Sequence, residues 1–269
     1  MITLPKLSTE LRYQLESKTN IVGLSGGKDS VATCILLYYL GIPFQTVTAE
    51  VWWDEETSGE HPYHYEFFHN KLLPKLHSWG IKTDVVRSDI TAYQFMTTPV
   101  AYSKEHPERV GKLRGFPLCG TCSIQRDCKL RVCKKYYRNQ KEPYNTILGL
   151  ANNEKDRVLS ANAKSQIALL DALDIHEYQT FYIDHQEGLL SPTYSFSDRG
   201  GCWFCPNQKI QELELLYREF PHLWEKLMEI QRMPNKVQEK FNRTQTLYDI
   251  EKEILSGVQM KLFMNDFLN

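Results

Sequence analysis

The fold expected for this chain is decided by the stretch Ile21-Val22-Gly23-Leu24-Ser25-Gly26-Gly27-Lys28-Asp29-Ser30. A short apolar run ends there in a turn with two adjacent glycines. Apolar residues then recur at helical spacing from Val31 to Tyr39. Gly41-Ile42-Pro43 would end that helix. The stretch therefore predicts a buried strand, a glycine-rich turn and a helix, in that order.

Later segments repeat this alternation. Their residue patterns predict strands over 44–53, 82–87 and 146–150, and helices over 62–79, 124–139 and 161–177. Residues 90–120 and 190–207 are expected to be irregular. A repeated strand–helix–strand order implies right-handed crossovers. We therefore expect an α/β fold, a mostly parallel twisted sheet with helices on both faces, followed by a C-terminal helical extension over 208–269.

The composition is that of a globular protein. Apolar residues make up 42% of the 269 residues and charged residues 24%, and 32 Lys and Arg stand against 33 Asp and Glu. This balance argues against a generally basic nucleic-acid-binding protein, but it leaves room for a local basic patch. No apolar run suits a signal peptide or a membrane span, so we expect no membrane partner and a cytoplasmic location.

The glycine-rich turn suits a phosphate group. Glycines let backbone N–H groups approach a phosphate closely, and the start of a helix adds unpaired N–H groups and a positive dipole end. We expect Lys28 to counter phosphate charge, Ser25 and Ser30 to donate hydrogen bonds, and Asp29 to cap the helix or hold Mg²⁺. The pattern is not a Walker A motif, which would need Gly at position 22 and Ser or Thr at position 29. This chain has Val22 and Asp29 there.

The chain has seven cysteines. In a reducing compartment they favour metal ligands or redox groups over disulfides. Two Cys-x-x-Cys pairs stand out, Cys119 with Cys122 and Cys202 with Cys205. Two such pairs can complete a tetrahedral four-sulfur site, which would hold Zn²⁺ or a [4Fe–4S] cluster. The spacing does not choose between the two metals. Cys34 is expected in the core.

A basic segment surrounds two further cysteines. Nine cations and a single acid lie between Lys112 and Lys141. This local excess would suit a sulfate, a second phosphate or a nucleic-acid backbone, or else it is a solvated helix face. Cys128 and Cys133 are interpreted as ordinary buried cysteines, with a role as metal ligand or reactive thiol left open.

Taken together, these motifs resemble the PP-loop superfamily, the N-type ATP pyrophosphatases, and within it the PAPS reductase-like branch, over about residues 20–230. Ser25 to Ser30 resemble its pyrophosphate-binding loop, and Cys128-Lys129-Leu130-Arg131 its basic substrate-binding stretch. Residues 148–157, Leu-Gly-Leu-Ala-Asn-Asn-Glu-Lys-Asp-Arg, resemble its Gly-x-Arg-x-x-Glu-x-x-Arg motif. Residues 50–62 and 189–206 resemble its acidic segment and its late cysteine loop.

The resemblance implies an adenine nucleotide alpha hydrolase-like fold and cleavage of ATP between its α and β phosphates. It also implies, as in several members, a [4Fe–4S] cluster. Two departures matter. PAPS reductases carry a C-terminal cysteine that takes the sulfite group, whereas no cysteine follows Cys205 here. The Ser-Gly-Gly-Lys-Asp-Ser loop is typical of members that hydrolyse ATP, so ATP-dependent activation is favoured over reduction.

We therefore expect an ATP-dependent adenylation or sulfur-transfer enzyme, with a nucleotide-binding domain carrying the cysteine loops over 1–207 and the helical extension over 208–269. The expected catalytic residues are Lys28, Asp29, Asp54, Glu154 and Arg157. The nucleotide is expected on Ser25, Gly26, Gly27, Lys28, Asp29, Ser30, Lys129 and Arg131.

The expected cofactors are ATP, Mg²⁺ and a [4Fe–4S] cluster or Zn²⁺. The expected partners are an adenine nucleotide, a nucleic-acid or small-molecule acceptor, a sulfur-donor protein and a second copy in a homodimer. Two alternatives stay open. One is a PAPS or APS reductase-like oxidoreductase, and the other is a non-catalytic nucleotide-sensing subunit with structural zinc.

Overall fold

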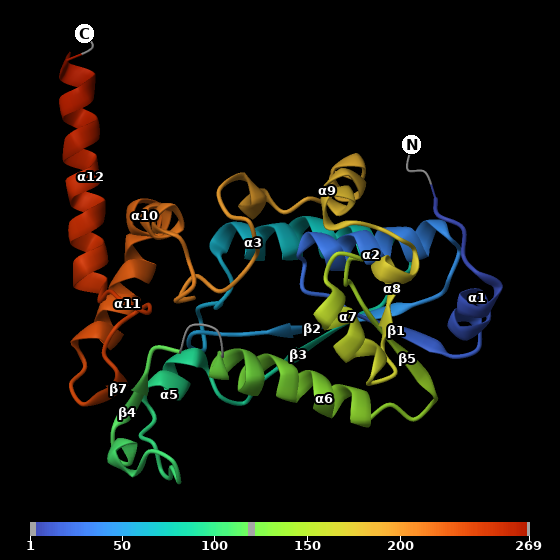
Figure 1. Ribbon diagram of the computed structural model, residues 1–269, viewed down its shortest axis with the longest axis horizontal. Helices are drawn as coiled ribbons and strands as arrows, with labels where there is room; N and C mark the ends of the chain where they lie inside the picture. The colour runs from blue at the N-terminus through green and yellow to red at the C-terminus, as the bar shows by residue number, and fades with distance from the viewer. Residues whose placement is uncertain (1–3, 118–121, 268–269) are drawn as a thin grey trace. The chain divides into compact units, whose positions relative to one another are not determined.

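The computed structural model describes residues 4–117 and 122–267 (Figure 1). The chain divides into two compact units. The first unit contains Met1–Glu50, Glu60–Ser88 and Lys129–Gly200, and the second contains Val51–Gly59, Asp89–Cys128 and Gly201–Asn269. Cys119 lies outside the described residues.

A five-stranded parallel sheet forms the centre of the first unit. Its strands stand in the order β3-β2-β1-β5-β6. The strands are β1 (Thr19–Gly23), β2 (Gln45–Glu50), β3 (Thr83–Arg87), β5 (Tyr144–Leu148) and β6 (Ile167–Ala168). The helices of this unit are α1 (Thr9–Glu16), α2 (Lys28–Tyr39), α3 (Pro62–Phe67), α4 (Leu73–Ser78), α6 (Arg131–Arg138), α7 (Lys155–Asn162), α8 (Leu169–Ala172) and α9 (Glu177–Gln186). The expected α/β fold with a parallel sheet is confirmed.

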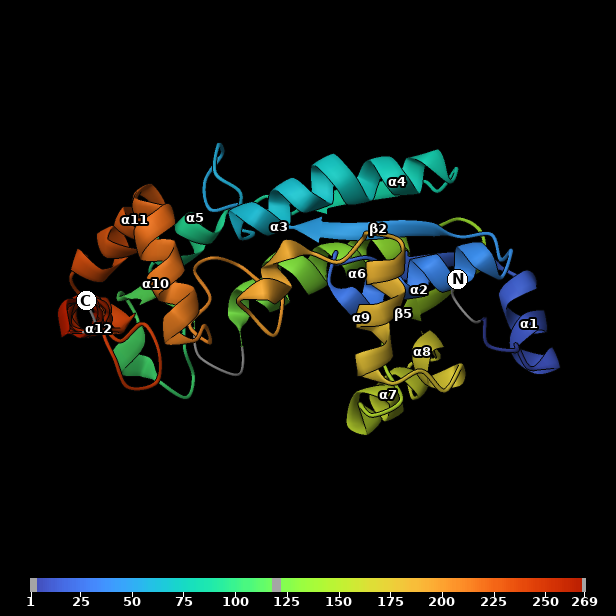
Figure 2. The same ribbon diagram turned by 90° about the horizontal axis from the view of Figure 1, so that it is seen from above.

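The strand order explains why helices cover both faces of the sheet. The chain moves from β1 to β2 to β3 in one direction and then crosses back to β5 on the other side of β1. Because such crossovers are right-handed, a reversal of direction puts the connecting helix on the opposite face. Figure 1 shows α2 and α9 above the sheet and α6 below it, and Figure 2 shows α9 crossing over α2.

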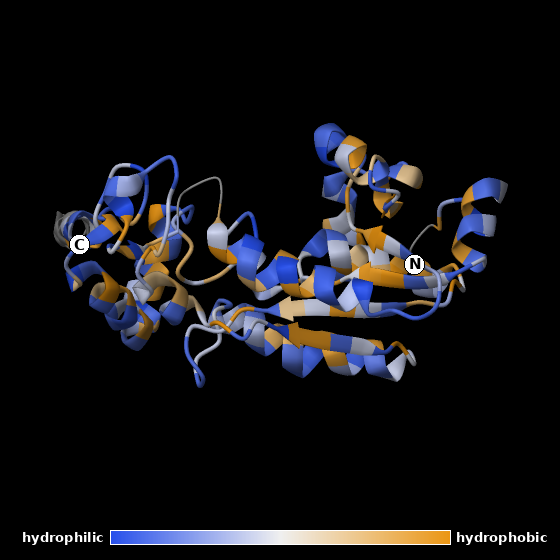
Figure 3. Cartoon of the chain, turned by 90° about the horizontal axis from the view of Figure 1, so that it is seen from below, coloured by the Kyte–Doolittle hydropathy of each residue, from blue (hydrophilic) through white to orange (hydrophobic). Residues whose placement is uncertain are grey.

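The core of the first unit follows from these layers. Strand β1 is buried over Asn20–Val22, and nearly every residue of α2 up to Leu37 is buried as well. β1 is the central strand of the sheet, and α2 packs between β1 and α9, so both elements are buried on most of their sides. Figure 3 shows the same pattern, with hydrophobic strands and helices that alternate between the two colours. The glycine-rich turn therefore connects two of the most buried elements of the unit.

The expected helix over 62–79 is confirmed with one irregularity. Between α3 and α4 the chain forms a π-helical turn over Phe68–Leu72. Pro74 lies two residues further on, and proline has no N–H group to give to an α-helical bond. The wider π turn is a common way to absorb such a missing bond.

The expected helix over 161–177 is wrong. Helix α7 ends at Asn162, and the chain then forms the edge strand β6, the short α8 and the start of α9. Ser165 and Asp174 have φ values of 55° and 56°. Residues in this left-handed conformation commonly follow the end of a helix, as Ser165 follows α7 and Asp174 follows α8. The buried apolar run over 167–170 lies between these two residues. A short apolar run fits a strand or a helix equally well, which is why periodicity misread it.

The second unit has its own core, built around aromatic side chains. It contains α5 (Ala92–Thr97), α10 (Ile210–Glu219), α11 (Pro221–Arg232), α12 (Leu247–Phe267) and a two-stranded sheet of β4 (Leu113–Gly115) and β7 (Lys236–Gln238). Trp53 and Trp203 are buried with ring centroids 4.7 Å apart. Segments 51–59 and 89–128, which the sequence analysis places in the nucleotide-binding domain, pack here with the C-terminal helices. No helix within the described ranges combines the length and the apolarity that a membrane span requires.

Candidate functional site

The turn between β1 and α2 needs glycine for two reasons. Gly26 has φ +75°, a conformation that side chains with a Cβ rarely adopt. A Cβ added there would also lie 2.8 Å from Phe68 and 2.9 Å from the His64 ring, which is closer than real contacts allow. The backbone of the turn is therefore pressed against α3 and the π-helical turn that follows it. A bulkier residue at this position would displace the turn.

Hydrogen bonds between its own residues fix the shape of this turn. The Ser25 N–H donates to Ser30 Oγ over 3.2 Å, and Ser30 Oγ donates to the Gly27 carbonyl over 2.8 Å. The Gly27 N–H reaches Ser25 Oγ at 3.3 Å. Both serine hydroxyls thus hold the turn itself. We expected them to donate to a ligand, and they would have to exchange partners to do so.

Lys28 is the first residue of α2, and its side chain is buried. Its Nζ lies 2.7 Å from Glu177 Oε1 and 2.9 Å from Asp29 Oδ2. The ammonium also lies 5.4 Å from the centroid of the Phe181 ring. Burial by itself would lower the pKa of Lys28, but the hydrogen bonds to Glu177 and Asp29 outweigh it and raise the pKa above its ordinary value. Lys28 is therefore a permanent cation held by two carboxylates.

Helix α9 supplies one continuous face to the start of α2. Glu177, Thr180, Phe181 and Asp184 recur at the spacing that puts residues on one side of a helix. Thr180 Oγ1 donates to Asp29 Oδ1 over 3.0 Å, which orients the Asp29 carboxylate. The sequence analysis did not identify any of these four residues. Their helical spacing was the available signal, and it was hidden by the wrong helix boundary at residue 177.

Asp184 is the unusual member of this face. Its side chain has no exposed surface, and neither carboxylate oxygen has a hydrogen-bond partner within the described chain. Burial, and then the charge of Asp29, raise the pKa of Asp184 to about 9. The group is therefore a neutral carboxylic acid at neutral pH. It lies beneath the Lys28–Asp29 pair without adding a further negative charge.

A tyrosine hydroxyl already occupies one backbone donor of the turn. The Lys28 N–H donates to the Tyr194 hydroxyl oxygen over 3.0 Å. Tyr194 belongs to a 3₁₀ turn over Pro192–Ser195, far from the glycine-rich turn in the sequence. The first N–H groups of a helix are the ones that bind phosphate oxygens in such sites. The phenol oxygen thus lies where a phosphate oxygen would accept the same hydrogen bond.

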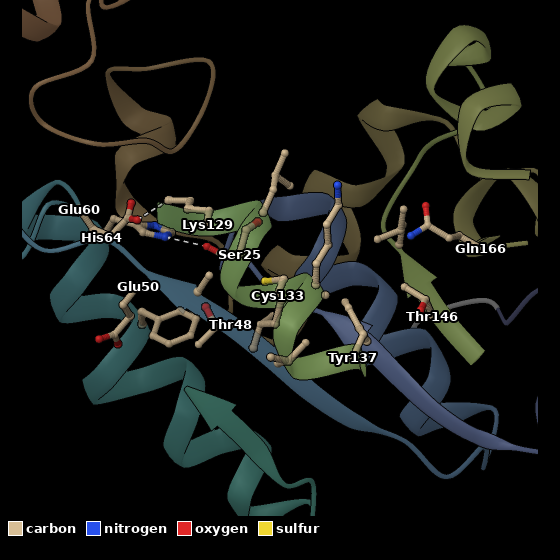
Figure 4. Close-up of a pocket in the computed structure, with 18 of the residues that line it drawn as sticks. Ser25, Thr48, Glu50, Glu60, His64, Lys129, Cys133, Tyr137, Thr146 and Gln166 are labelled. Atoms are coloured by element: carbon tan, nitrogen blue, oxygen red, sulfur yellow. Dashed lines mark hydrogen bonds and ion pairs between the residues drawn. The ribbon is translucent and has the colours of Figure 1, made fainter. Parts of the chain in front are cut away.

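A cavity of about 510 Å³ opens beside the turn (Figure 4). Its walls come from the ends of β1, β2 and β5, from α3 and from α6, and they include Gly23, Leu24, Ser25, Val47, Thr48, Ala49, Glu50, Glu60, His64, Tyr65, Phe68, His69, Lys129, Leu130, Cys133, Lys134, Tyr137, Thr146, Leu148, Lys164 and Gln166. β1 lies between β2 and β5, so the cavity sits where the strand order reverses. In open parallel sheets, ligands bind at this place. The volume is in the range of small-molecule sites.

His64 joins the cavity to the turn. Its Nε2 lies 3.1 Å from the Ser25 carbonyl oxygen, and its Nδ1 lies 3.1 Å from Ser191 Oγ. A carbonyl oxygen only accepts, so Nε2 carries the proton and Nδ1 accepts from the serine hydroxyl. Burial lowers the pKa of His64 below its ordinary value, against the opposing charge of Glu60. The imidazole is thus neutral and fixes the backbone of the turn at the cavity wall, as Figure 4 shows.

The motif over residues 148–157 lies close to Lys28. A Cβ added at Gly149 would lie 2.5 Å from the Asp29 carbonyl oxygen, so the end of β5 lies directly against the start of α2. Asn153 Nδ2 lies 3.5 Å from Glu177 Oε2, and the Glu177 N–H donates to Asn153 Oδ1 over 3.1 Å. Lys28, Glu177 and Asn153 therefore form one connected chain of contacts.

Glu154 and Arg157 follow directly after Asn153 and form an ion pair with each other. Glu154 also accepts a hydrogen bond from the Ala151 N–H over 3.2 Å, while Arg157 is exposed. The charge of Arg157 contributes to lowering the pKa of Glu177, after the larger effect of the hydrogen bond from Lys28. The structure thus brings this motif and Lys28 together through Glu177.

Two other expected residues lie at the cavity or near it. Lys129 lines the cavity, and its Nζ lies 2.5 Å from Glu60 Oε1, another lining residue. Arg131 is an exposed residue at the start of α6 and is not among the lining residues. Asp54 belongs to the second unit, where its carboxylate lies 2.5 Å from Lys226 Nζ and accepts the Thr57 N–H. Asp54 is thus engaged in structural contacts of that unit.

Three of the four expected sulfur ligands are described, and all belong to the second unit. The Cys205 N–H donates to the Cys202 carbonyl, so the two form a tight turn. Cys122 and Cys202 are partly buried against the aromatic core of this unit. Residues 4–117 and 122–267 contain no group of three or more His, Cys, Asp or Glu that could hold a metal ion. Because Cys119 lies outside these ranges, the four-sulfur site stays a prediction.

The two remaining cysteines have different surroundings. Cys128 is buried in the core of the second unit. Cys133 lies on α6 and lines the cavity, and Figure 4 shows its sulfur beside Tyr137. Burial raises the pKa of the Cys133 thiol, and the charge of Lys129 opposes that rise. Cys133 is thus a protonated thiol in the cavity wall at neutral pH.

Comparison with known proteins adds nothing to this geometry. No family model matches the chain, and no curated protein matches its sequence.

Proposed function

We propose that this protein is a nucleotide-activating enzyme of the PP-loop type, in the PAPS reductase-like branch. It would bind ATP with the phosphates on the Ser25–Ser30 turn and the base in the adjoining cavity. An acceptor oxygen would attack the α-phosphorus, forming the new O–P bond as the bond to pyrophosphate breaks. A sulfide-level sulfur nucleophile from a donor protein would then attack the activated carbon, forming the C–S bond as the C–O bond to the adenylated oxygen breaks and AMP leaves.

The observation that carries this proposal is the junction of the turn with the cavity. Ser25 belongs to both, and Gly23 and Leu24 line the cavity directly before it. A phosphate on the N–H groups of the turn would place the rest of a nucleotide over the ends of β1 and β2. The walls combine apolar and aromatic side chains, such as Leu24, Val47 and Phe68, with polar ones that could fix the orientation of a ligand.

The charges around Lys28 define what binding requires. Lys28 pairs with both Glu177 and Asp29, and it is not among the residues that line the cavity. ATP would take the ammonium from these carboxylates, which are then left for Mg²⁺ bound to the substrate or for solvent. The residues of the turn would hold and orient the phosphates, so their contribution would be positioning and charge stabilisation.

The test is ATP binding and pyrophosphate release by wild type and by Lys28→Ala. A charge-assisted hydrogen bond contributes about 1.5–3 kcal/mol, so the variant should bind ATP about 10- to 100-fold more weakly. Lys18→Ala is the matched control, because Lys18 is exposed and lies before β1. Unfolding curves of both variants separate weaker binding from loss of fold.

Three outcomes would decide against the proposal. Equal ATP affinity in the wild type and Lys28→Ala would show that the phosphates do not bind at Lys28. Binding without pyrophosphate release, with nucleic-acid and small-molecule acceptors alike, supports a nucleotide sensor. Tighter binding of a 3′-phosphorylated nucleotide, together with sulfite release from PAPS, supports the reductase.

A further inference from the structure

The polar side chains that line the cavity differ in whether they already have partners. Most of the ionisable ones are engaged: Glu60 with Lys129, Glu50 with His69, His64 with Ser191, and Lys164 with Ser160. Four uncharged ones form no hydrogen bond through their side chains with any residue of 4–117 and 122–267: Thr48, Tyr137, Thr146 and Gln166. Their amide and hydroxyl groups are therefore available to a ligand in the cavity.

Three of these four side chains lie in the same part of the cavity. The register of β5 and β6 places Thr146 beside Gln166, and both residues line the cavity. Figure 4 shows these two and Tyr137 on one side of the cavity, and the ion pair of Glu60 and Lys129 on the other. We call Tyr137, Thr146 and Gln166 the amide–hydroxyl cluster.

The backbone of Gln166 is held from both sides. Ser165, with φ 55°, turns the chain after α7, and the Gln166 N–H then donates to the Ala161 carbonyl oxygen over 3.0 Å. The next residue, Ile167, is buried and begins β6. The half-buried Gln166 side chain thus starts from a fixed backbone, while its amide has no partner among the described residues.

Tyr137 connects the amide–hydroxyl cluster to β1. Its ring stacks on that of Tyr144, with centroids 5.8 Å apart and an interplanar angle of 17°. Its hydroxyl lies 3.7 Å from the position that a Cβ at Gly23 would take, at the end of β1 before the glycine-rich turn. Burial raises the pKa of Tyr137, so the phenol stays protonated at neutral pH. The cluster therefore extends to the strand that leads into the proposed phosphate site.

The amide of Gln166 is the group of this cluster that can distinguish one base from another. A hydroxyl, as in Tyr137 or Thr146, both donates and accepts, whereas an amide has a donor beside an acceptor. Adenine presents a matching pair on one edge, the N6 amino donor beside the N7 acceptor. Guanine presents two acceptors there, O6 and N7, so the amide oxygen of Gln166 would face another oxygen.

From this arrangement we propose that Gln166 determines the specificity of the site for adenine, with its amide bonded to the N6 amino group and N7 of the base. The inference rests on the proposed function, since it takes the base of ATP to lie in this cavity. A bidentate contact of this kind discriminates against the wrong base about 5- to 150-fold. Because Gln166 would contact the base and not the phosphates, its loss should raise the KM for ATP more than it lowers kcat.

The test measures the affinities of the full chain for ATP, 7-deaza-ATP and GTP by calorimetry. In 7-deaza-ATP a CH group replaces N7, while the amino group and the phosphates are unchanged. The wild type should bind it about two- to tenfold more weakly than ATP, the effect of one net hydrogen bond. GTP should bind about 5- to 150-fold more weakly than ATP. Gln166→Ala should bind ATP more weakly and should bind ATP and 7-deaza-ATP equally.

Gln14→Ala is the matched control, because Gln14 is exposed on α1 of the same unit, and it should keep the wild-type ratios. Gln166→Met keeps most of the side-chain volume without the amide and serves if the alanine variant loses stability in urea. Equal binding of ATP and 7-deaza-ATP by the wild type would overturn the role of Gln166, and so would the wild-type ratio in Gln166→Ala. If Lys28→Ala still weakens ATP binding in that case, the proposed function stands without this inference. A wild type that binds none of the three nucleotides refutes the proposed function itself.

Discussion

The buried carboxyl of Asp184 leads to a prediction about stability and pH. The ordinary pKa of this side chain is 3.8, and the fold raises it to about 9. Below about pH 4 the group is protonated in both folded and unfolded chains, so it contributes no pH dependence. Between these pKa values the unfolded chain releases the proton and the folded chain keeps it. The stability of the fold therefore falls as the pH rises through this window.

The size of the effect follows from the same linkage. One proton bound only by the folded state changes the free energy of unfolding by about 1.4 kcal/mol per pH unit. From pH 6 to pH 8, Asp184 should lower the stability of the wild type by about 3 kcal/mol. Asp184→Asn cannot ionise and lacks this slope. The variant should thus gain about 3 kcal/mol on the wild type between these two pH values, whatever its stability at pH 6.

The measurement is urea unfolding of the wild type and Asp184→Asn at pH 6, 7 and 8. All other titrating groups are shared, so they cancel in the difference between the two proteins. Asp156→Asn is the control, because Asp156 is an exposed acid on α7 in the same unit, and its difference from the wild type should stay constant. Parallel pH curves for the wild type and Asp184→Asn would show that Asp184 is ionised in the fold, and the reasoning from burial would then be refuted.

Two further predictions concern ATP at the proposed site. Tyr194→Phe removes the hydroxyl that accepts the Lys28 N–H. ATP should then bind about two- to tenfold more tightly in calorimetry, because one net hydrogen bond no longer has to be broken. Weaker binding would mean that the hydroxyl contacts the nucleotide. Cys133 lines the cavity, so ATP at ten times its Kd should slow alkylation of this thiol by N-ethylmaleimide about tenfold, followed by peptide mass spectrometry. The alkylation rate of Cys133 without ATP is the reference, and an unchanged rate at this ATP concentration would count against a nucleotide in this cavity.

The sequence was sufficient to predict the α/β class of the first unit, its parallel sheet and the strand–turn–helix order around the two glycines. Strand β1, the turn and α2 combine strong local signals, because a buried apolar run, two adjacent glycines and a helical repeat all agree. The region after α7 was misread because its apolar run is too short for periodicity to separate a strand from a helix. Ser165 and Asp174 bound that run, and neither is a residue whose left-handed conformation the sequence signals as strongly as glycine does.

Much of the candidate site depends on contacts between distant residues. Glu177 and Tyr194 reach Lys28 from 149 and 166 residues further along the chain. No local pattern encodes such pairs, since they arise from the packing of α9 and of a 3₁₀ turn on α2. Asp184 could not be told from a surface acid by its neighbours in the sequence. Asp184 is buried because α9 packs against α2, and that packing joins residues far apart in the sequence.

These contacts between distant residues determine which charges surround the start of α2. Lys28 pairs with Asp29 and Glu177, and Tyr194 accepts its N–H, so in the proposed function the phosphates would have to replace these existing partners. Because Asp184 stays protonated, the phosphates would meet two charged carboxylates at this place and not three. If Asp184 were ionised, its charge would repel the phosphates, and the low dielectric constant of the buried site would strengthen this repulsion. For the proposed function, the neutral state of Asp184 therefore matters because one cation already faces two carboxylates here, and a third negative charge would oppose the binding of an anion further.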